Sequence, residues 1–156
     1  MKKQLLSFRY AIEGILSAIA TESHIRFHLV AGFYVFLFAF LGRFNTTEWA
    51  VLIVTVCAVL CSELLNTAME RLCDLYTTEE NKNIKFIKDV AAGAVLVFAV
   101  GAAAVALCLF VFTGKLADAL HLITASHPLL LIPLCISAVL SVIFVTKGFG
   151  LKRKSK

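Results

Sequence analysis

The chain has 156 residues, 60% of them hydrophobic, with a mean hydropathy of +0.90 and a net charge of +5. This apolar content excludes an ordinary soluble enzyme and predicts an integral membrane protein of the all-α class. The basic residues form no stripe with interleaved aromatics, so we expect contact with an anionic bilayer surface and no nucleic-acid partner.

The first predicted element is an amphipathic helix over about residues 4–21. Polar side chains recur along one side of this segment, which makes it too polar to span, so we expect it to lie in the membrane interface. A first span follows over about residues 26–42. We expect its helix to continue inward from the preceding one.

Two further spans are predicted over about residues 49–72 and 89–113, and a polar loop joins them. The second span begins at a tryptophan, which suits the outer interface, and its N-cap is expected at Thr46 or Thr47. The third span is rich in alanine and glycine. We therefore expect it to pack closely against neighbouring helices.

Residues 114–156 extend the chain beyond these three spans. We expect a polar linker, then an additional fourth span over about residues 129–146 that Pro133 interrupts, and finally a basic tail on the cytoplasmic side. The sequence thus divides into a core of residues 1–113 and an extension of residues 114–156.

The basic residues also predict the topology of this multi-pass chain. With the N-terminus inside and four spans, all but two of the 15 lysines and arginines fall on the cytoplasmic side, the exceptions being Arg43 and Lys115. This distribution follows the positive-inside rule. Together with the family resemblance given below, this predicts the cell membrane of a bacterium as the location of the protein.

A polar stripe crosses the second span near its cytoplasmic end. Glu63, Asn66, Glu70 and Asp74 follow the spacing i, i+3, i+7 and i+11, which places them on one face of a helix. Because a charge at membrane depth costs about 2.5 kcal/mol or more, such residues predict a functional site facing protein or water.

The residues near this stripe suit phosphoryl transfer, provided that the helix at Glu22 packs beside the second span. Carboxylates such as Glu22 and Glu70 suit a Mg²⁺ ion that bridges substrate phosphates, and Lys88 can neutralise a phosphate. Glu63 lies deepest, and a desolvated carboxylate can take the proton of a hydroxyl. The common nucleotide-binding signatures are absent from the sequence.

At these residues the sequence resembles a known family, the prokaryotic diacylglycerol kinases, and in particular its undecaprenol kinases from Gram-positive bacteria. The resemblance covers about residues 5–112 and rests on three motifs: Glu63-Leu-Leu-Asn66-Thr-Ala-Met-Glu70-x-x-x-Asp74, then Lys85-x-x-Lys88-Asp89-x-Ala-Ala-Gly, and the upstream segment Glu22-Ser-His-Ile-Arg26-Phe-His28.

The resemblance implies a small helical kinase, with ATP as co-substrate and Mg²⁺ as cofactor, that phosphorylates a membrane lipid. Undecaprenol is the favoured acceptor and diacylglycerol the second, and a homotrimer is implied. The implied roles are a general base at Glu63, metal binding by Glu22 and Glu70, and lipid contact at Glu63 and Asn66. The remaining implied site residues are Asn66, Lys88 and Asp89 for catalysis, with Glu22, Glu70, Asp74, Lys88 and Asp89 for ATP binding.

Two features depart from the family pattern: Ile87 replaces a small residue before the Lys88-Asp89 pair, and the fourth span exceeds the three-span core. One alternative stays open, a non-catalytic transporter or assembly subunit whose acidic stripe carries protons or cations. The histidines are interpreted as interface or loop residues. The sequence leaves open whether Arg9 and Arg26 contact nucleotide or lipid headgroups.

Overall fold

The computed structural model describes residues 2–77, 79 and 81–147, with side chains from Gln4 onward. The predicted basic tail lies almost wholly outside these residues. The described chain is helical and contains no strand, so the predicted all-α class is confirmed. Its helices are α1 (Lys2–Thr21), α2 (Ser23–Leu41), α3 (Thr46–Tyr76), α4 (Lys82–Ala106), α5 (Lys115–His121) and α6 (Leu131–Lys147).

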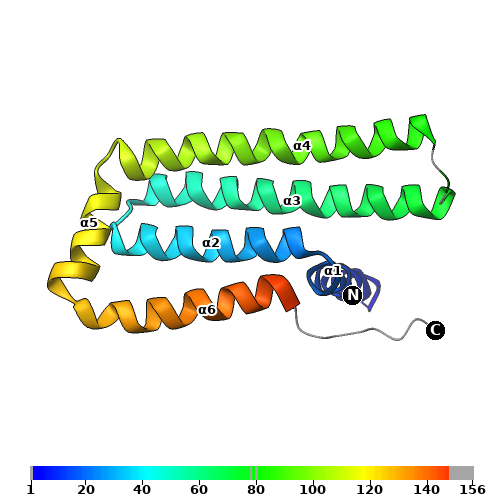
Figure 1. The fold of residues 1–156 in the computed structure, drawn as a ribbon. Coiled ribbons are helices and arrows are strands. Elements are labelled where there is room, and N and C mark those ends of the chain that lie inside the picture. The colour runs from blue at the N-terminus through cyan, green and yellow to red at the C-terminus, as the bar shows by residue number, and fades with distance from the viewer. Residues whose placement is uncertain (1, 78, 80, 148–156) are drawn as a thin grey trace.

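The four long helices lie side by side in one layer in the order α4, α3, α2, α6 (Figure 1). The short helix α5 crosses one end of this layer, and α1 crosses the other end at a steep angle to the long helices (Figure 1). The loop between α3 and α4 lies at the same end as α1. The predicted polar stripe therefore runs toward the end of the layer that carries α1 and this loop.

Four helical segments are long and apolar enough to cross a membrane: Ser23–Leu41, Thr46–Tyr76, Lys82–Val111 and Pro128–Lys147. The prediction of a membrane protein is thus confirmed. The second segment has 31 residues, which at 1.5 Å per residue is about 46 Å, against a hydrocarbon layer of about 30 Å. Its last turns therefore extend past the hydrocarbon.

The junction between α1 and α2 differs from the expected continuous helix. Glu22 has an extended backbone, with φ −106° and ψ 120°, and it separates the two helices. On α1 the apolar side chains Leu5, Phe8 and Ile12 are exposed, as expected for a helix whose apolar face enters an interface. The bend at Glu22 is what turns α1 across the layer.

The extension also differs from its prediction in two places. Residues 115–126, expected as a polar linker, form α5 and a π-helical turn, and they bury Ala119 and Ile123. Pro133 does not interrupt the fourth span, because it lies in the first turn of α6, where a backbone N–H has no partner within the helix.

The buried apolar core lies at the α5 end of the layer. Ala39, Phe44, Leu52 and Phe110 are buried together there, and the rings of Phe44 and Phe110 are 4.6 Å apart between centroids. The N-cap of α3 is Asn45 rather than Thr46 or Thr47, and it forms a reciprocal capping box with Glu48. Glu48 also pairs with Lys115 at the start of α5.

Candidate active site

The polar stripe lies on the half of α3 that is farther from α5. Its deepest member, Glu63, is buried on α3 between its neighbours α2 and α4, with 7% of the side chain exposed. The later members lie one turn apart toward the α3–α4 loop and become more exposed, up to 59% for the Asp74 side chain. The stripe therefore runs from the protein interior to the layer's polar end.

Glu63 is paired with a histidine of the neighbouring helix. Nε2 of His28 on α2 lies 3.0 Å from Oε1 of Glu63, within ion-pair distance, and Glu63 has no second side-chain partner within the described chain. The interpretation of His28 as a simple interface histidine is therefore wrong. The rule that a buried charge needs a partner at its own depth is the signal that could have identified it.

One turn along α3, Asn66 and Glu70 form a second polar pair. Nδ2 of Asn66 donates to Oε1 of Glu70 at 3.0 Å. The amide oxygen of Asn66 is buried, and among the described residues it has no hydrogen-bond partner. A buried acceptor without a donor is costly, which marks this oxygen as one that a donor group of a ligand could satisfy.

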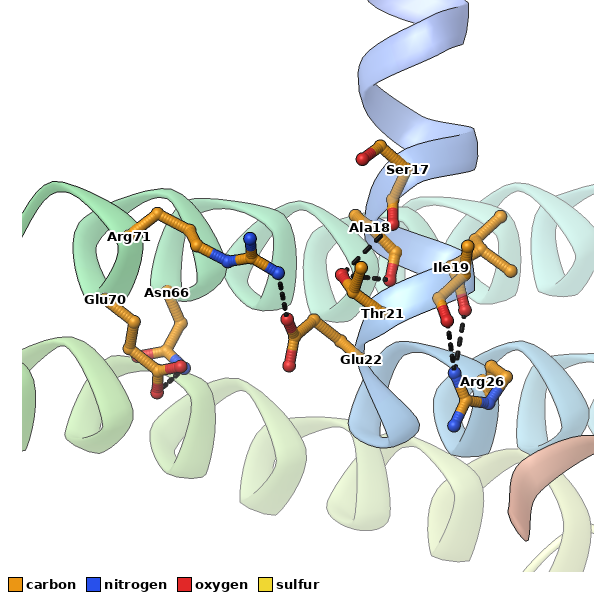
Figure 2. A network of polar contacts seen from close by, with 10 residues as sticks. Ser17, Ala18, Ile19, Thr21, Glu22, Arg26, Asn66, Glu70 and Arg71 are labelled. Atoms are coloured by element: carbon orange, nitrogen blue, oxygen red, sulfur yellow. Dashed lines mark hydrogen bonds and ion pairs between the residues drawn. The ribbon is translucent and has the colours of Figure 1, made fainter. Parts of the chain in front are cut away.

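Glu22, at the α1–α2 bend, is brought to the same part of α3. Its Oε1 accepts a hydrogen bond from Nη2 of Arg71 at 3.0 Å, and Figure 2 shows Arg71 reaching from α3 to Glu22. Because Arg71 directly follows Glu70, the Glu22 carboxylate lies beside the turn that carries Glu70. The packing of α1 against α3 required by the sequence analysis is present.

Glu22 and Glu70 each offer a carboxylate oxygen that could coordinate a Mg²⁺ ion together with a nucleotide. Each carboxylate has a protein partner on one oxygen, and no hydrogen bond to the second oxygen occurs within the described chain. The described residues contain no group of three His, Cys, Asp or Glu that could hold a metal ion by themselves. Mg²⁺ commonly uses only one or two protein carboxylates, with waters and substrate phosphates as its other ligands.

The other predicted site residues lie in a separate pocket at the α3–α4 loop. This pocket, of about 530 Å³, is lined by Asp74, Lys88 and Asp89 together with the basic residues Lys82 and Lys85. Nζ of Lys88 is 2.6 Å from Oδ1 of Asp74. The structure thus divides the predicted site into an inner cluster (Glu22, Glu63, Asn66 and Glu70, with His28) and this loop pocket.

Arg9 and Arg26, whose contacts the sequence left open, lie in different surroundings. Arg26 is buried and donates to main-chain carbonyls of α1 and α6, so it faces neither a nucleotide nor a lipid headgroup. Arg9 is exposed on α1 and pairs with Glu13 at 2.8 Å, which leaves it in the interface region.

A comparison with protein families connects this geometry to a known family. Residues 9–110 match the family described as prokaryotic diacylglycerol kinase. The chain belongs to this family. The predicted family is therefore confirmed, and the match contains α2, α3, α4 and every residue of the inner cluster and the loop pocket. Helix α6 lies beyond the matched residues.

Two curated relatives are named after lipid kinases. The chain is 42% identical over 106 residues to a diacylglycerol kinase of Synechocystis and 38% identical over 104 residues to the undecaprenol kinase of Bacillus subtilis. Each alignment covers 67% of this chain; it spans 61% of the Synechocystis protein, less than two thirds, and 85% of the Bacillus protein. No solved structure matches the chain. Both names agree with the enzyme class predicted from the sequence, a lipid kinase, and they differ in the lipid.

Proposed function

We propose that this protein transfers the γ-phosphate of MgATP to the hydroxyl of a membrane lipid. The observation that carries the proposal is the inner cluster: a buried glutamate held by His28, next to two carboxylates and an amide oxygen that lacks a partner. Phosphoryl transfer depends mostly on positioning and charge neutralisation, and these groups supply both.

Glu63 is the proposed general base. Its Oε1 is bound by His28, which leaves Oε2 to accept the proton of a lipid hydroxyl. Because the lipid's apolar chains remain in the hydrocarbon, its hydroxyl reaches only a group within the bilayer. The buried position of Glu63 meets this requirement, and Asn66, one turn away, can orient the same hydroxyl.

Glu22 and Glu70 are proposed to hold Mg²⁺, which when bound neutralises charge on the nucleotide's phosphates. Lys88 and Asp89 are proposed to bind and orient the nucleotide from the loop pocket, together with Asp74. Binding of a phosphate by Lys88 would replace its present contact with Asp74. Asp74 is only four residues, about 6 Å, along α3 from Glu70, so one nucleotide can contact both parts of the site.

Undecaprenol is the proposed acceptor, with diacylglycerol second. Support comes from the alignment with the Bacillus undecaprenol kinase, which spans 85% of that protein, compared with 61% of the Synechocystis diacylglycerol kinase. The Glu22 to His28 segment that resembles the Gram-positive branch contains two members of the inner cluster.

The proposed location is the bacterial cell membrane, with the N-terminus and the active site on the cytoplasmic side. The described basic residues support this orientation, since Arg71, Lys82 and Lys88 lie at the end with the α3–α4 loop, whereas Arg43 and Lys115 lie at the α5 end. The nucleotide would then reach the loop pocket from the cytoplasm.

The proposed assembly is a homotrimer. The four-helix layer is open on its faces, and α4, at one edge, exposes the small residues Ala94 and Gly101, which are seven residues apart and therefore share one face of the helix (Figure 1). A side chain added at Gly101 would meet open space within this chain. Such a surface supports close packing against a helix of another copy.

The non-catalytic alternative requires a polar path across the bilayer. On α3, the hydroxyls of Thr55 and Ser62 donate hydrogen bonds to backbone carbonyls of the same helix. No carboxylate lies between Glu48 and Glu63. The stripe therefore ends inside the layer, which favours a site open at one side.

Phosphate transfer from γ-labelled ATP to undecaprenol and to diacylglycerol, measured in separate bilayers with Mg²⁺, tests the proposal. We expect labelled undecaprenyl phosphate as the main product, and none with Glu63→Gln. Labelled phosphatidic acid alone would reassign the acceptor. No product from either lipid, with folded protein, would reject the kinase in favour of the non-catalytic alternative.

A further inference from the structure

Arg26 is a buried charge whose partners are unusual. Its relative exposure is 6%, and within the described residues no carboxylate pairs with it. Instead, its guanidinium donates from Nη1 to the carbonyls of Ile19 and Ala20, at 2.9 and 3.3 Å, and from Nε to the carbonyl of Val145, at 3.1 Å. Without such partners a buried guanidinium would be strongly destabilising.

Two of the three carbonyls belong to the last turn of α1. Ile19 and Ala20 precede the end of α1 at Thr21, and carbonyls at a helix C-terminus have no intrahelical donor and carry partial negative charge. The third carbonyl, that of Val145, lies on α6. One cation on α2 therefore caps α1 and joins it to α6.

Helix α6 has a second polar attachment to α2. The hydroxyl of Tyr34 lies 3.0 Å from Oγ of Ser137 and 3.3 Å from Oγ of Ser141. These contacts lie two turns from Arg26 along α2, about 12 Å. They fix α6 lengthwise on α2 and bring the Val145 carbonyl to the guanidinium.

The capped junction contains a residue of the inner cluster. Glu22 is the one extended residue between α1 and α2, and Arg26 lies one helical turn after it. Figure 2 shows Arg26 holding the end of α1 on one side of the bend while Glu22 points toward Arg71 on the other. The angle at which α1 leaves α2 sets where the Glu22 carboxylate lies relative to Glu70.

We propose that α6 is a clamp that positions Glu22 through Arg26. The helix lies outside the residues matched by the family and contributes no side chain to the inner cluster. Its function is to supply the Val145 carbonyl, which orients the guanidinium so that Nη1 holds the end of α1. Arg26 is thus a positioning residue. The expected effect on metal dependence rests on the proposed function, in which Glu22 binds Mg²⁺.

Two measurements on the full chain in lipid bilayers test the clamp. The first is hydrogen exchange of the amides of residues 18–22, which include the bond from the Glu22 N–H to the Ala18 carbonyl at 2.8 Å. The second is the Mg²⁺ concentration for half-maximal lipid phosphorylation, together with kcat at saturating Mg²⁺. The first measurement needs no catalytic activity.

The test variants loosen α6 or remove the cap. Ser137→Leu with Ser141→Leu replaces the hydroxyls that bind Tyr34 by bulkier apolar groups. The matched control is Val139→Phe with Val142→Phe, which adds volume to exposed positions of the same helix. Arg26→Gln removes the cap itself, and the serine pair keeps the test decisive if that variant does not fold.

For the serine pair we expect exchange at residues 18–22 to rise about tenfold and half-maximal Mg²⁺ to rise about threefold, with kcat within twofold of wild type. Arg26→Gln should raise this exchange further, and the control should change neither quantity. Unchanged exchange in the serine pair would overturn the clamp. Equally faster hydrogen exchange along α4 in this variant would also overturn the clamp, because it would indicate a general loosening of the helices. If the wild type phosphorylates no lipid, the proposed function fails, and hydrogen exchange alone decides the clamp.

Discussion

The two ends of the helical layer use glutamate in different ways, as Glu48 and Glu63, both on α3, show. At the α5 end, Glu48 caps its own helix, pairs with Lys115 and adjoins the buried rings of Phe44 and Phe110. At the opposite end, Glu63 is more deeply buried and has His28 as its one described partner.

The difference indicates which end is built for stability and which for binding. At the α5 end Glu48 is matched by Asn45 and Lys115, and aromatic side chains pack between the helices. At the α1 end the amide oxygen of Asn66 lacks a partner, and the carboxylates are held at one oxygen only. A ligand that enters this end gains contacts that the protein itself does not provide. Substitutions at the two ends should therefore separate activity from stability.

The largest effect is expected for Glu63→Gln, which keeps the shape of the side chain and removes the base. Lipid phosphorylation should fall by about 10²- to 10⁴-fold, whereas MgATP binding, measured by titration calorimetry, should stay near the wild-type value. A folded variant that no longer binds MgATP would contradict the assigned role.

At the opposite end, Phe44→Ala should act on stability. Removing the ring from the cluster with Phe110 leaves a cavity that costs about 3 kcal/mol, measured by unfolding in mixed micelles. Activity per folded molecule should not change. A loss of kcat without a loss of stability would show that the two ends are not separate.

Within the inner cluster, Glu70→Ala should change the metal requirement. Losing one of two proposed ligands is expected to raise the half-maximal Mg²⁺ concentration by about 30-fold, equivalent to about 2 kcal/mol. The titration should be made at saturating lipid. If wild-type activity does not depend on Mg²⁺ at all, the metal role of Glu22 and Glu70 is wrong.

A smaller effect is expected for His28→Asn, which shortens the donor that holds Glu63. We expect kcat to fall about tenfold, because Glu63 would lose the one described partner that holds it, with KM for MgATP unchanged. Steady-state kinetics with varied MgATP makes this distinction. Equal changes in both constants would argue for a general disturbance of the site.

The smallest effect is expected for Asn45→Ala at the α5 end. Losing the N-cap of α3 should lower the free energy of unfolding by about 1 kcal/mol and leave phosphorylation intact. Thermal unfolding together with the lipid assay checks both parts. A drop in activity larger than the drop in folded protein would contradict the separation of the ends.

The sequence predicts the four spans well because their apolar runs are long, and it predicts the polar stripe because Glu63, Asn66 and Glu70 share one helical face. It fails at α5 and the π-helical turn that follows, because this short segment carries Lys115, Asp118 and His121 and yet buries Ala119 and Ile123. It also misses the pairing of His28 with Glu63 and the capping by Arg26. These contacts join helices that are distant along the chain, and helical periodicity carries no information about which faces of two helices meet.

The central claim is that the α1 end of α3 performs phosphate transfer. The most direct test compares the rate of labelled phosphate transfer to undecaprenol for wild type, Glu63→Gln and Glu48→Gln in the same bilayers. We predict that Glu48→Gln keeps most of the wild-type rate per folded molecule and that Glu63→Gln loses nearly all of it. Transfer by folded Glu63→Gln at the wild-type rate would contradict the account.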